Sequence, residues 1–294
     1  MSDKLATVGE AVSVSGLRVR FWGVRGSIAC GGGDYCRYGG NTSCIELRLG
    51  DRLVILDAGT GLRRLGVALD TPLDVDIFLT HTHVDHIQGI PFFGPLFDPE
   101  SDIRIHAGNQ GYERTLEEVL HDYMAAPLFP IPPSVFSAKV DYRCFLSGSS
   151  FELGDDIVVR TARLNHPNGA TGYRFDYQGR SFCYVTDTEH VPGEPDQRIL
   201  ELIEGADLMV YDCTFTDEEF PRYVGWGHST WQEAVRLCNA ANVGRLIVTH
   251  HDPNHDDEFL DEVAEAAGAA REGTVLAREG LEVSLPPDGG FSYR

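Results

Sequence analysis

Three histidines and one aspartate lie within six consecutive residues that begin at His81 and read His-Thr-His-Val-Asp-His. An apolar, strand-like run at 75–80 precedes them. Side chains two residues apart in an extended chain lie on the same side, so His81 and His83 are expected to point the same way. A helical turn that starts near Asp85 moves Asp85 and His86 to a second position. Two imidazoles for one ion, and a carboxylate with an imidazole for the next, suit zinc, iron or manganese, so the segment predicts a metal site.

Four other segments each provide one ligand-type side chain at the end of an apolar run. Residues 53–61 predict a buried strand that ends in Asp57 and a glycine turn. Three later runs end in the same way, at His166, Asp187 and His250. None of these residues would be informative alone, but side chains at strand ends commonly form functional sites on layered folds. The five segments together predict one shared site.

The order aspartate, HxHxDH, histidine, aspartate, histidine resembles the metallo-β-lactamase superfamily over roughly residues 18–285. The resemblance implies an α/β (α+β) fold, a four-layer αββα sandwich, in one domain spanning residues 1–294. It also implies two divalent metal ions, with zinc expected and manganese or iron as alternatives. The matching positions assign the first ion to His81, His83 and His166, the second to Asp85, His86 and His250, the bridge between them to Asp187, and the orientation of a ligand imidazole to Asp57.

A second motif, Gly-Trp-Gly-His-Ser-Thr at 225–230, resembles the phosphodiesterase branch of that superfamily, which contains RNase Z and related cyclic phosphodiesterases. In that branch the histidine lies over the metals and handles the scissile phosphate, and an acid orients it. His228 and Asp212 match these positions, with Asp where RNase Z typically has Glu. The alternative is that Ser229 or Thr230 merely begins a helix, since Thr230 and Glu233 form a capping-box pattern.

The resemblance therefore implies a phosphodiesterase in which a metal-bridging hydroxide attacks a small, cyclic phosphodiester, such as a cyclic nucleotide or phosphoribosyl cyclic phosphate. Asp85, Asp212 and His228 are the predicted catalytic residues, with His228 protonating the leaving oxygen. One alternative is a hydrolase of a carboxylic ester, thioester or lactone; another is an RNA 3′-processing endonuclease of the RNase Z type. The arm with which RNase Z clamps tRNA is not recognisable. The diiron flavoproteins of this fold typically have Glu in the central motif, and a non-catalytic binding module is a further alternative.

The balance of charge limits the partners. The chain has 24 Lys and Arg residues against 45 Asp and Glu, a net charge of −21. Binding a nucleic-acid backbone requires a positive face, so neither long nucleic acid nor an anionic membrane is expected. A small anion can still bind, because two divalent cations reverse the local field. The expected partner is a small phosphodiester, and a homodimer is left open.

Cysteine content and the amino terminus favour the cytoplasm. Seven cysteines, an odd number without CxxC spacing, indicate free thiols in a reducing compartment. Cys30, Cys36 and Cys44 fit no familiar metal spacing and are interpreted as packing or loop residues. Residues 1–16 lack a signal-peptide pattern, and no apolar run approaches the ~20 residues of a membrane span.

Apolar periodicity predicts the positions of the remaining elements. Strands are expected at 17–22, 43–49, 53–57, 75–80, 151–161, 171–177, 180–186, 207–211, 275–277 and 281–285. Helices are expected at 111–124, at 196–204, after Thr230 and at 256–267.

Several further residues are candidates for parts of the site. Arg25 or Arg37 is a candidate phosphate contact, and 41–43 a candidate pocket floor, although glycine-rich segments more often only form turns. The Pro-rich runs 91–97 and 125–130 are expected near the mouth, where a base could stack; core packing or a dimer contact is the alternative. The histidines without a place in the pattern are His106, His121 and His190, expected at the surface, and His251 and His255, to which no metal is assigned.

Overall fold

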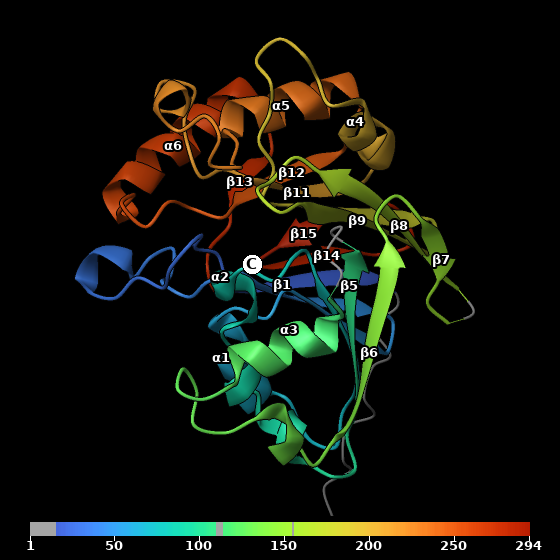
Figure 1. Ribbon diagram of the computed structural model, residues 1–294. Helices are drawn as coiled ribbons and strands as arrows, with labels where there is room; N and C mark the ends of the chain where they lie inside the picture. Colours follow the sequence, from blue (N-terminus) through green and yellow to red (C-terminus); the bar gives the residue numbers. More distant parts are fainter. Residues whose placement is uncertain (1–15, 110–113, 155) are drawn as a thin grey trace, which may run out of the picture.

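Two β-sheets lie face to face with helices on their outer sides in the computed structural model (Figure 1), which describes residues 16–109, 114–154 and 156–294. This is the expected four-layer αββα sandwich. The eight-stranded sheet has the order β15-β14-β1-β2-β3-β4-β5-β6. Its strands are β1 (Leu17–Gly23), β2 (Cys44–Leu49), β3 (Arg52–Leu56), β4 (Asp74–Leu79), β5 (Asp102–Asn109), β6 (Lys139–Leu146), β14 (Glu282–Leu285) and β15 (Ser292–Tyr293).

The seven-stranded sheet has the order β13-β12-β11-β10-β9-β8-β7. Its strands are β7 (Ser150–Glu152), β8 (Ile157–Leu164), β9 (Ala170–Tyr177), β10 (Arg180–Val185), β11 (Leu208–Asp212), β12 (Arg245–Thr249) and β13 (Thr274–Leu276). The helices are α1 (Gly61–Ala68), α2 (Val84–Ile87), α3 (Leu116–Tyr123), α4 (Gln197–Ile203), α5 (Trp231–Ala240) and α6 (Asp257–Ala270). In Figure 1, α1 and α3 lie on the first sheet, and α4, α5 and α6 lie on the second.

The main core lies between the sheets because alternate strand residues are apolar and point inward. Phe21, Phe78 and Phe175 are fully buried in it. A second apolar cluster lies between the first sheet and its helices, and a third between the second sheet and α4–α6. Burial of apolar surface on both faces fixes each sheet between its neighbouring layers.

The direction of the strands sets the position of the site. Strands β3 to β6 are parallel neighbours, and so are β10 to β13. Strand β8 runs in the same direction as β10, because both are antiparallel to β9. The residues that follow these strands therefore collect along one edge of each sheet, where layered α/β folds place their ligands.

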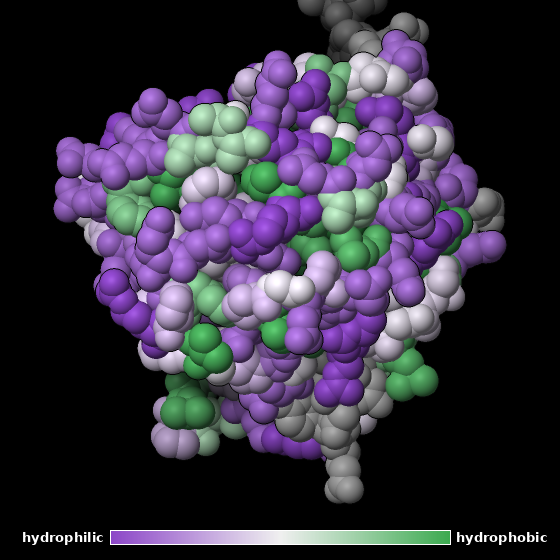
Figure 2. All heavy atoms as spheres, turned by 90° about the horizontal axis from the view of Figure 1, so that it is seen from above, coloured by the Kyte–Doolittle hydropathy of each residue, from purple (hydrophilic) through white to green (hydrophobic). Residues whose placement is uncertain are grey.

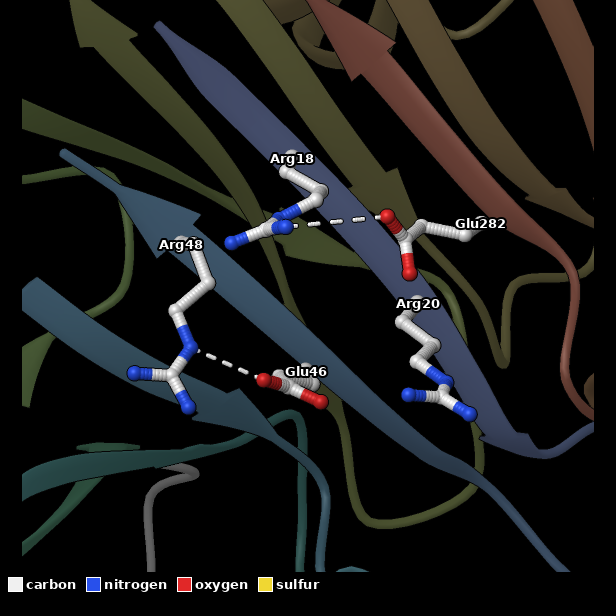
Figure 3. Close-up of a pocket in the computed structure, with 5 residues that line it drawn as sticks. All are labelled: Arg18, Arg20, Glu46, Arg48 and Glu282. Carbon is white, nitrogen blue, oxygen red and sulfur yellow. Dashed lines mark hydrogen bonds and ion pairs between the residues drawn. The ribbon is translucent and has the colours of Figure 1, made fainter. Parts of the chain in front are cut away.

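The outer face of the first sheet is charged where β14, β1 and β2 meet (Figure 3). Arg18 and Arg20 alternate with inward-pointing apolar residues along β1. Arg18 pairs with Glu282 at 3.7 Å, and Arg48 pairs with Glu46 at 2.8 Å. These side chains line a shallow hollow of about 130 Å³. Seen from above the α4–α6 layer, the surface is mostly hydrophilic with scattered apolar spots (Figure 2).

Two predicted elements differ from the observed ones. The helix predicted at 111–124 begins only at Leu116, because Thr115 and Glu118 form a capping box; residues 111–113 lie outside the described part. The strand predicted at 151–161 is divided into β7 and β8, because Gly154 takes a left-handed turn with φ 76°. Helix α1 and strands β5 and β6 were not expected. In β5 and β6, charged residues interrupt the apolar pattern.

The Pro-rich runs contribute to the core as well as the surface. Phe93 and Leu96 are fully buried beneath the first sheet's helices, whereas Phe92 is half exposed. Leu128 is exposed. All seven cysteines are free, as expected. Among the described residues, no helix is both long and apolar enough to cross a membrane.

Candidate metal centre

All seven predicted ligand residues come together at the carboxyl edge of the two sheets. Each one follows the end of a strand or lies in the short helix after it. The first sheet provides His81 and His83 after β4, with Asp85 and His86 in α2. The second sheet provides the remaining ligands, which are His166 after β8, Asp187 after β10 and His250 after β12.

One ligand set consists of His86 Nε2, His250 Nε2, Asp85 Oδ2 and Asp187 Oδ2. His86 Nε2 lies 3.2 Å from each carboxylate oxygen and 3.4 Å from His250 Nε2. His250 Nε2 lies 3.5 Å from Asp85 and 3.3 Å from Asp187. Zinc ligands at about 2.0–2.1 Å in a tetrahedron are about 3.3 Å apart. The spacing of these four atoms therefore fits one such ion.

The other set contains three imidazoles. His166 Nε2 lies 3.1 Å from His83 Nδ1 and 3.7 Å from Asp187 Oδ1. His81 Nε2 lies 4.0 Å from the same oxygen; it is buried, and no other described residue forms a hydrogen bond with it. A buried nitrogen without a partner is costly unless a ligand satisfies it, and a metal ion between these imidazoles would do so. Asp187 presents Oδ1 to this set and Oδ2 to the other, as a bridging carboxylate does.

Four ligand imidazoles use their second nitrogen for a hydrogen bond that orients the ring, as metal-bound histidines commonly do. The contacts are His86 Nδ1 with Asp57 Oδ2 at 2.9 Å, His166 Nδ1 with Gly227 O at 2.8 Å, His250 Nδ1 with Thr214 Oγ1 at 3.1 Å, and His81 Nδ1 with Thr80 Oγ1 at 3.1 Å. Asp57 thus lies where its predicted orienting role requires. Thr214 and the Gly227 carbonyl were missed, and a backbone oxygen leaves no signal in a sequence.

Burial and charge act differently on the two sets. Burial lowers the pKa of His81, His83 and His166, which favours the neutral form that binds metal. Burial also opposes the charged form of His250, but Asp187 and Asp85 outweigh it and raise the pKa of His250 to about 9. The set that contains Asp85, His86 and His250 therefore has buried negative charge that attracts cations, either protons or metal.

The backbone is strained at three residues of the centre. Asp57, Asp187 and His250 have φ values of 58°, 59° and 62°, in the left-handed region that side chains other than glycine rarely adopt. Each directly follows a strand or lies two residues after it. Strain of this kind persists where the surrounding structure fixes it, most often at functional sites.

His228 lies against both ligand sets. Its ring stacks on His250 with centroids 5.0 Å apart and lies 5.4 Å from His166. Its Nδ1 lies 3.1 Å from Asp212 Oδ2. Because Nδ1 faces Asp212, Nε2 is the nitrogen left for a substrate. Burial acts to raise the pKa of Asp212, but His228 outweighs it and lowers the pKa, so Asp212 is ionised.

The segment at 228–230 both begins helix α5 and places His228 beside Asp212. Thr230 caps α5 by accepting the Glu233 N–H at 3.0 Å. The predicted capping box is only half formed, because the Glu233 carboxylate pairs with Arg236 instead. The Ser229 hydroxyl is engaged with His190 Nδ1 at 2.8 Å.

The surface position predicted for His190 is wrong, since it is buried and stacks on Phe220. The same prediction is wrong for His106, which is buried against Phe78 and bonded to Asp76 at 2.8 Å. Each ring has one nitrogen hydrogen-bonded inside the protein, His190 Nδ1 to Ser229 and His106 Nε2 to Asp76. His121 is exposed, as expected.

Neither candidate arginine is directed at the centre. Arg25 is fully buried, and it donates to Gly39 O at 2.9 Å and to His255 O at 2.6 Å. Arg37 pairs with Asp261 of α6. Both guanidinium groups hold the loop after β1 in place, so the phosphate-contact hypothesis is not supported.

Thr42, His251 and His255 also hold loops in place through hydrogen bonds within the protein. Thr42 Oγ1 accepts the Thr60 N–H at 2.8 Å, which braces two loops. His251 Nε2 bonds Ala277 O at 2.9 Å, and His255 Nε2 bonds Glu219 at 2.8 Å. The loop after β1 does touch the centre through its backbone, because Ser27 N–H donates to Asp85 Oδ2 at 2.8 Å.

Two groups of ligand-type side chains at the strand ends share the Asp187 carboxylate, which makes the centre a candidate site for two metal ions. A family model described as the Beta-lactamase superfamily domain matches residues 52–251, and the chain belongs to this family. The chain is 29% identical over 296 residues to a ribonuclease Z of Haloferax volcanii, covering 83% of this chain and 90% of that one.

Two solved structures share the fold. The metallo-β-lactamase fold protein YhfI of Bacillus subtilis has a TM-score of 0.69 and 19% identity, covering 92% of this chain and 99% of that one. The short form of human tRNase Z has a TM-score of 0.65 and 23% identity, with the same coverage. The metallo-β-lactamase resemblance and fold inferred from the motifs are confirmed.

Proposed function

We propose that the protein is a dinuclear-metal phosphodiesterase that hydrolyses a small phosphodiester, with cyclic nucleotides and phosphoribosyl cyclic phosphate as the leading substrates. The broader activity, metal-dependent hydrolysis of a phosphodiester bond, follows from the family and from relatives that are ribonucleases. The observation that carries the proposal is the pairing of His228 with Asp212 beside a carboxylate that faces two ligand sets.

The first ion would be held by His81, His83 and His166, and the second by Asp85, His86 and His250, with Asp187 shared. Imidazole and carboxylate ligands of this kind favour zinc. When bound, the two ions supply an activated water near neutral pH and neutralise charge on the phosphoryl oxygens.

The protein's own contribution is to position a proton. Asp212 accepts the Thr214 N–H and the Asp187 N–H as well as facing His228, so it is rigidly held. With Nδ1 turned to Asp212, His228 presents Nε2–H to the leaving oxygen of the substrate. Proton donation to that oxygen would make His228 the general acid.

The charge of the chain supports a small substrate. A net charge of −21 disfavours the many phosphate contacts on which the binding of a long nucleic acid depends. RNA processing is the second candidate, because the relative from Haloferax volcanii is a ribonuclease. We also propose a cytoplasmic location, which the seven free cysteines support.

The proposal is tested by measuring kcat/KM on a panel of substrates with metal-loaded protein. The panel contains cyclic mononucleotides, cyclic dinucleotides, phosphoribosyl cyclic phosphate, a chromogenic diester, a lactone, a thioester and a precursor tRNA. We expect a small diester to give the highest value. A higher kcat/KM on precursor tRNA would favour the second candidate, and turnover confined to the lactone or thioester would overturn both.

A further inference from the structure

We infer that Glu189 is a positioning residue, which fixes His166 and thereby the first ligand set by holding the loop at 225–227. The inference uses the ligand assignment of the proposed function but not the identity of the substrate. Glu189 is half-buried and lies two residues after the bridging Asp187.

A single carboxylate oxygen of Glu189 accepts two backbone N–H groups of this loop. Glu189 Oε2 lies 2.7 Å from Gly225 N and 2.9 Å from Gly227 N. Both glycines have positive φ values, 93° and 88°. Glycine loops of this kind have many accessible conformations. The carboxylate therefore supplies the constraint that the loop sequence lacks.

The loop at 225–227 in turn positions the predicted ligand His166. The Gly227 carbonyl lies 2.8 Å from His166 Nδ1, which donates the hydrogen bond. A Cβ atom at Gly227 would lie only 2.4 Å from the same nitrogen, so the backbone at Gly227 packs closely against the imidazole. The bond keeps the proton on Nδ1 and leaves Nε2 with the lone pair that binds metal. In the other tautomer, His166 Nε2 would carry a proton and would not bind metal.

Glu189 also connects to the segment that carries His166. Glu189 N–H donates to Asn165 O at 2.7 Å, and Asn165 Nδ2 donates to Glu189 O at 2.8 Å. His228 follows Gly227 directly in the chain. One residue thus ties together the three segments that carry Asp187, His166 and His228.

A solvated surface carboxylate is the simpler interpretation, and two variants separate it from a positioning role. Glu189→Ala removes both acceptors. Glu189→Gln keeps an oxygen that can accept both N–H groups, because only one oxygen is used. Glu194→Ala is a matched control, since Glu194 is exposed in the same segment and its side chain makes no hydrogen bond among the described residues.

Zinc affinity is measured by competition with a chromophoric chelator, and the His166 tautomer by NMR of ¹⁵N-labelled histidine. We expect Glu189→Ala to weaken one of the two zinc equivalents about 10–100-fold, the usual scale for a residue behind a metal ligand. The other equivalent should be unchanged, and Glu189→Gln and Glu194→Ala should bind as wild type does.

Wild-type affinity for both equivalents in Glu189→Ala would overturn the inference, as would Glu189→Gln weakened to the same extent as Glu189→Ala. If Glu189→Ala fails to fold, the tautomer decides: a proton on His166 Nδ1 in wild type and in Glu189→Gln supports the inference, and a proton on Nε2 in either contradicts it. These readouts involve no substrate. An inactive wild type that shows the zinc effect would overturn the proposed function and leave the inference standing.

Discussion

Replacing His228 with alanine tests the chemistry of the proposed phosphodiesterase without removing any of the seven predicted metal ligands. The ring stacks on His250 but its Nδ1 is taken by Asp212, so the two ligand sets keep all their atoms when it is removed. Loss of a general acid typically lowers kcat by about 10²–10⁴-fold. At 1.36 kcal/mol for each factor of ten, this is about 2.7–5.4 kcal/mol of transition-state stabilisation.

The assay compares two diesters that differ only in the leaving group. An alkoxide leaving group needs a proton, whereas nitrophenolate does not, so His228→Ala should lose less activity on the nitrophenyl substrate. Metal content should stay at the wild-type value. His121→Ala, which changes an exposed histidine, is the control and should keep full activity.

Asp212→Asn should show a smaller loss in the same direction, and the double variant should be little worse than His228→Ala, because residues that act as a unit are not additive. Asp212 also bonds the backbone N–H groups of Asp187 and Thr214, so the metal content of this variant must be checked. Full activity of His228→Ala on every diester would show that the histidine only precedes a helix, and the reasoning would be refuted.

Three further predictions concern the metal centre and its supporting loop. Asp187→Ala should lose metal from both positions, because its two oxygens face different ligand sets; loss of only one equivalent in elemental analysis would contradict the bridge. Metal affinity should rise with pH up to about 9, because His250 is protonated below that pKa in the metal-free protein and a cation must displace the proton; a pH-independent chelator competition would be inconsistent with this. Arg25→Met should lower the free energy of unfolding by about 1–3 kcal/mol, since it leaves buried carbonyl groups without a donor; unchanged stability in urea together with a raised KM would instead indicate a phosphate contact.

Most residues of the candidate metal centre could be predicted from the sequence, because the predicted ligands are side chains at strand ends. A strand end is visible as the end of an apolar run, and parallel strands bring their carboxyl ends together. The positions of His81, Asp187 and His250 were therefore predictable before their distances were known. The contact of Asp57 with His86 and the pairing of His228 with Asp212 were also predictable from the motifs.

What could not be predicted depends on the backbone or on partners from another part of the chain. The Gly227 carbonyl and the Ser27 N–H have no side-chain signal. Arg25 resembles a phosphate-binding residue in its local motif, yet one of its hydrogen-bond partners, the His255 carbonyl, lies 230 residues away in the chain. His106 has the polarity of a surface residue, and only its pairing with Asp76 explains its burial.

The most direct test of the dinuclear centre is the metal content of protein purified without chelators, measured by elemental analysis before and after reconstitution with zinc. Two complete ligand sets that share Asp187 predict about two ions per chain. Diester hydrolysis should then follow occupancy of the second equivalent. A content near one that reconstitution does not raise, with full activity, would contradict the dinuclear centre.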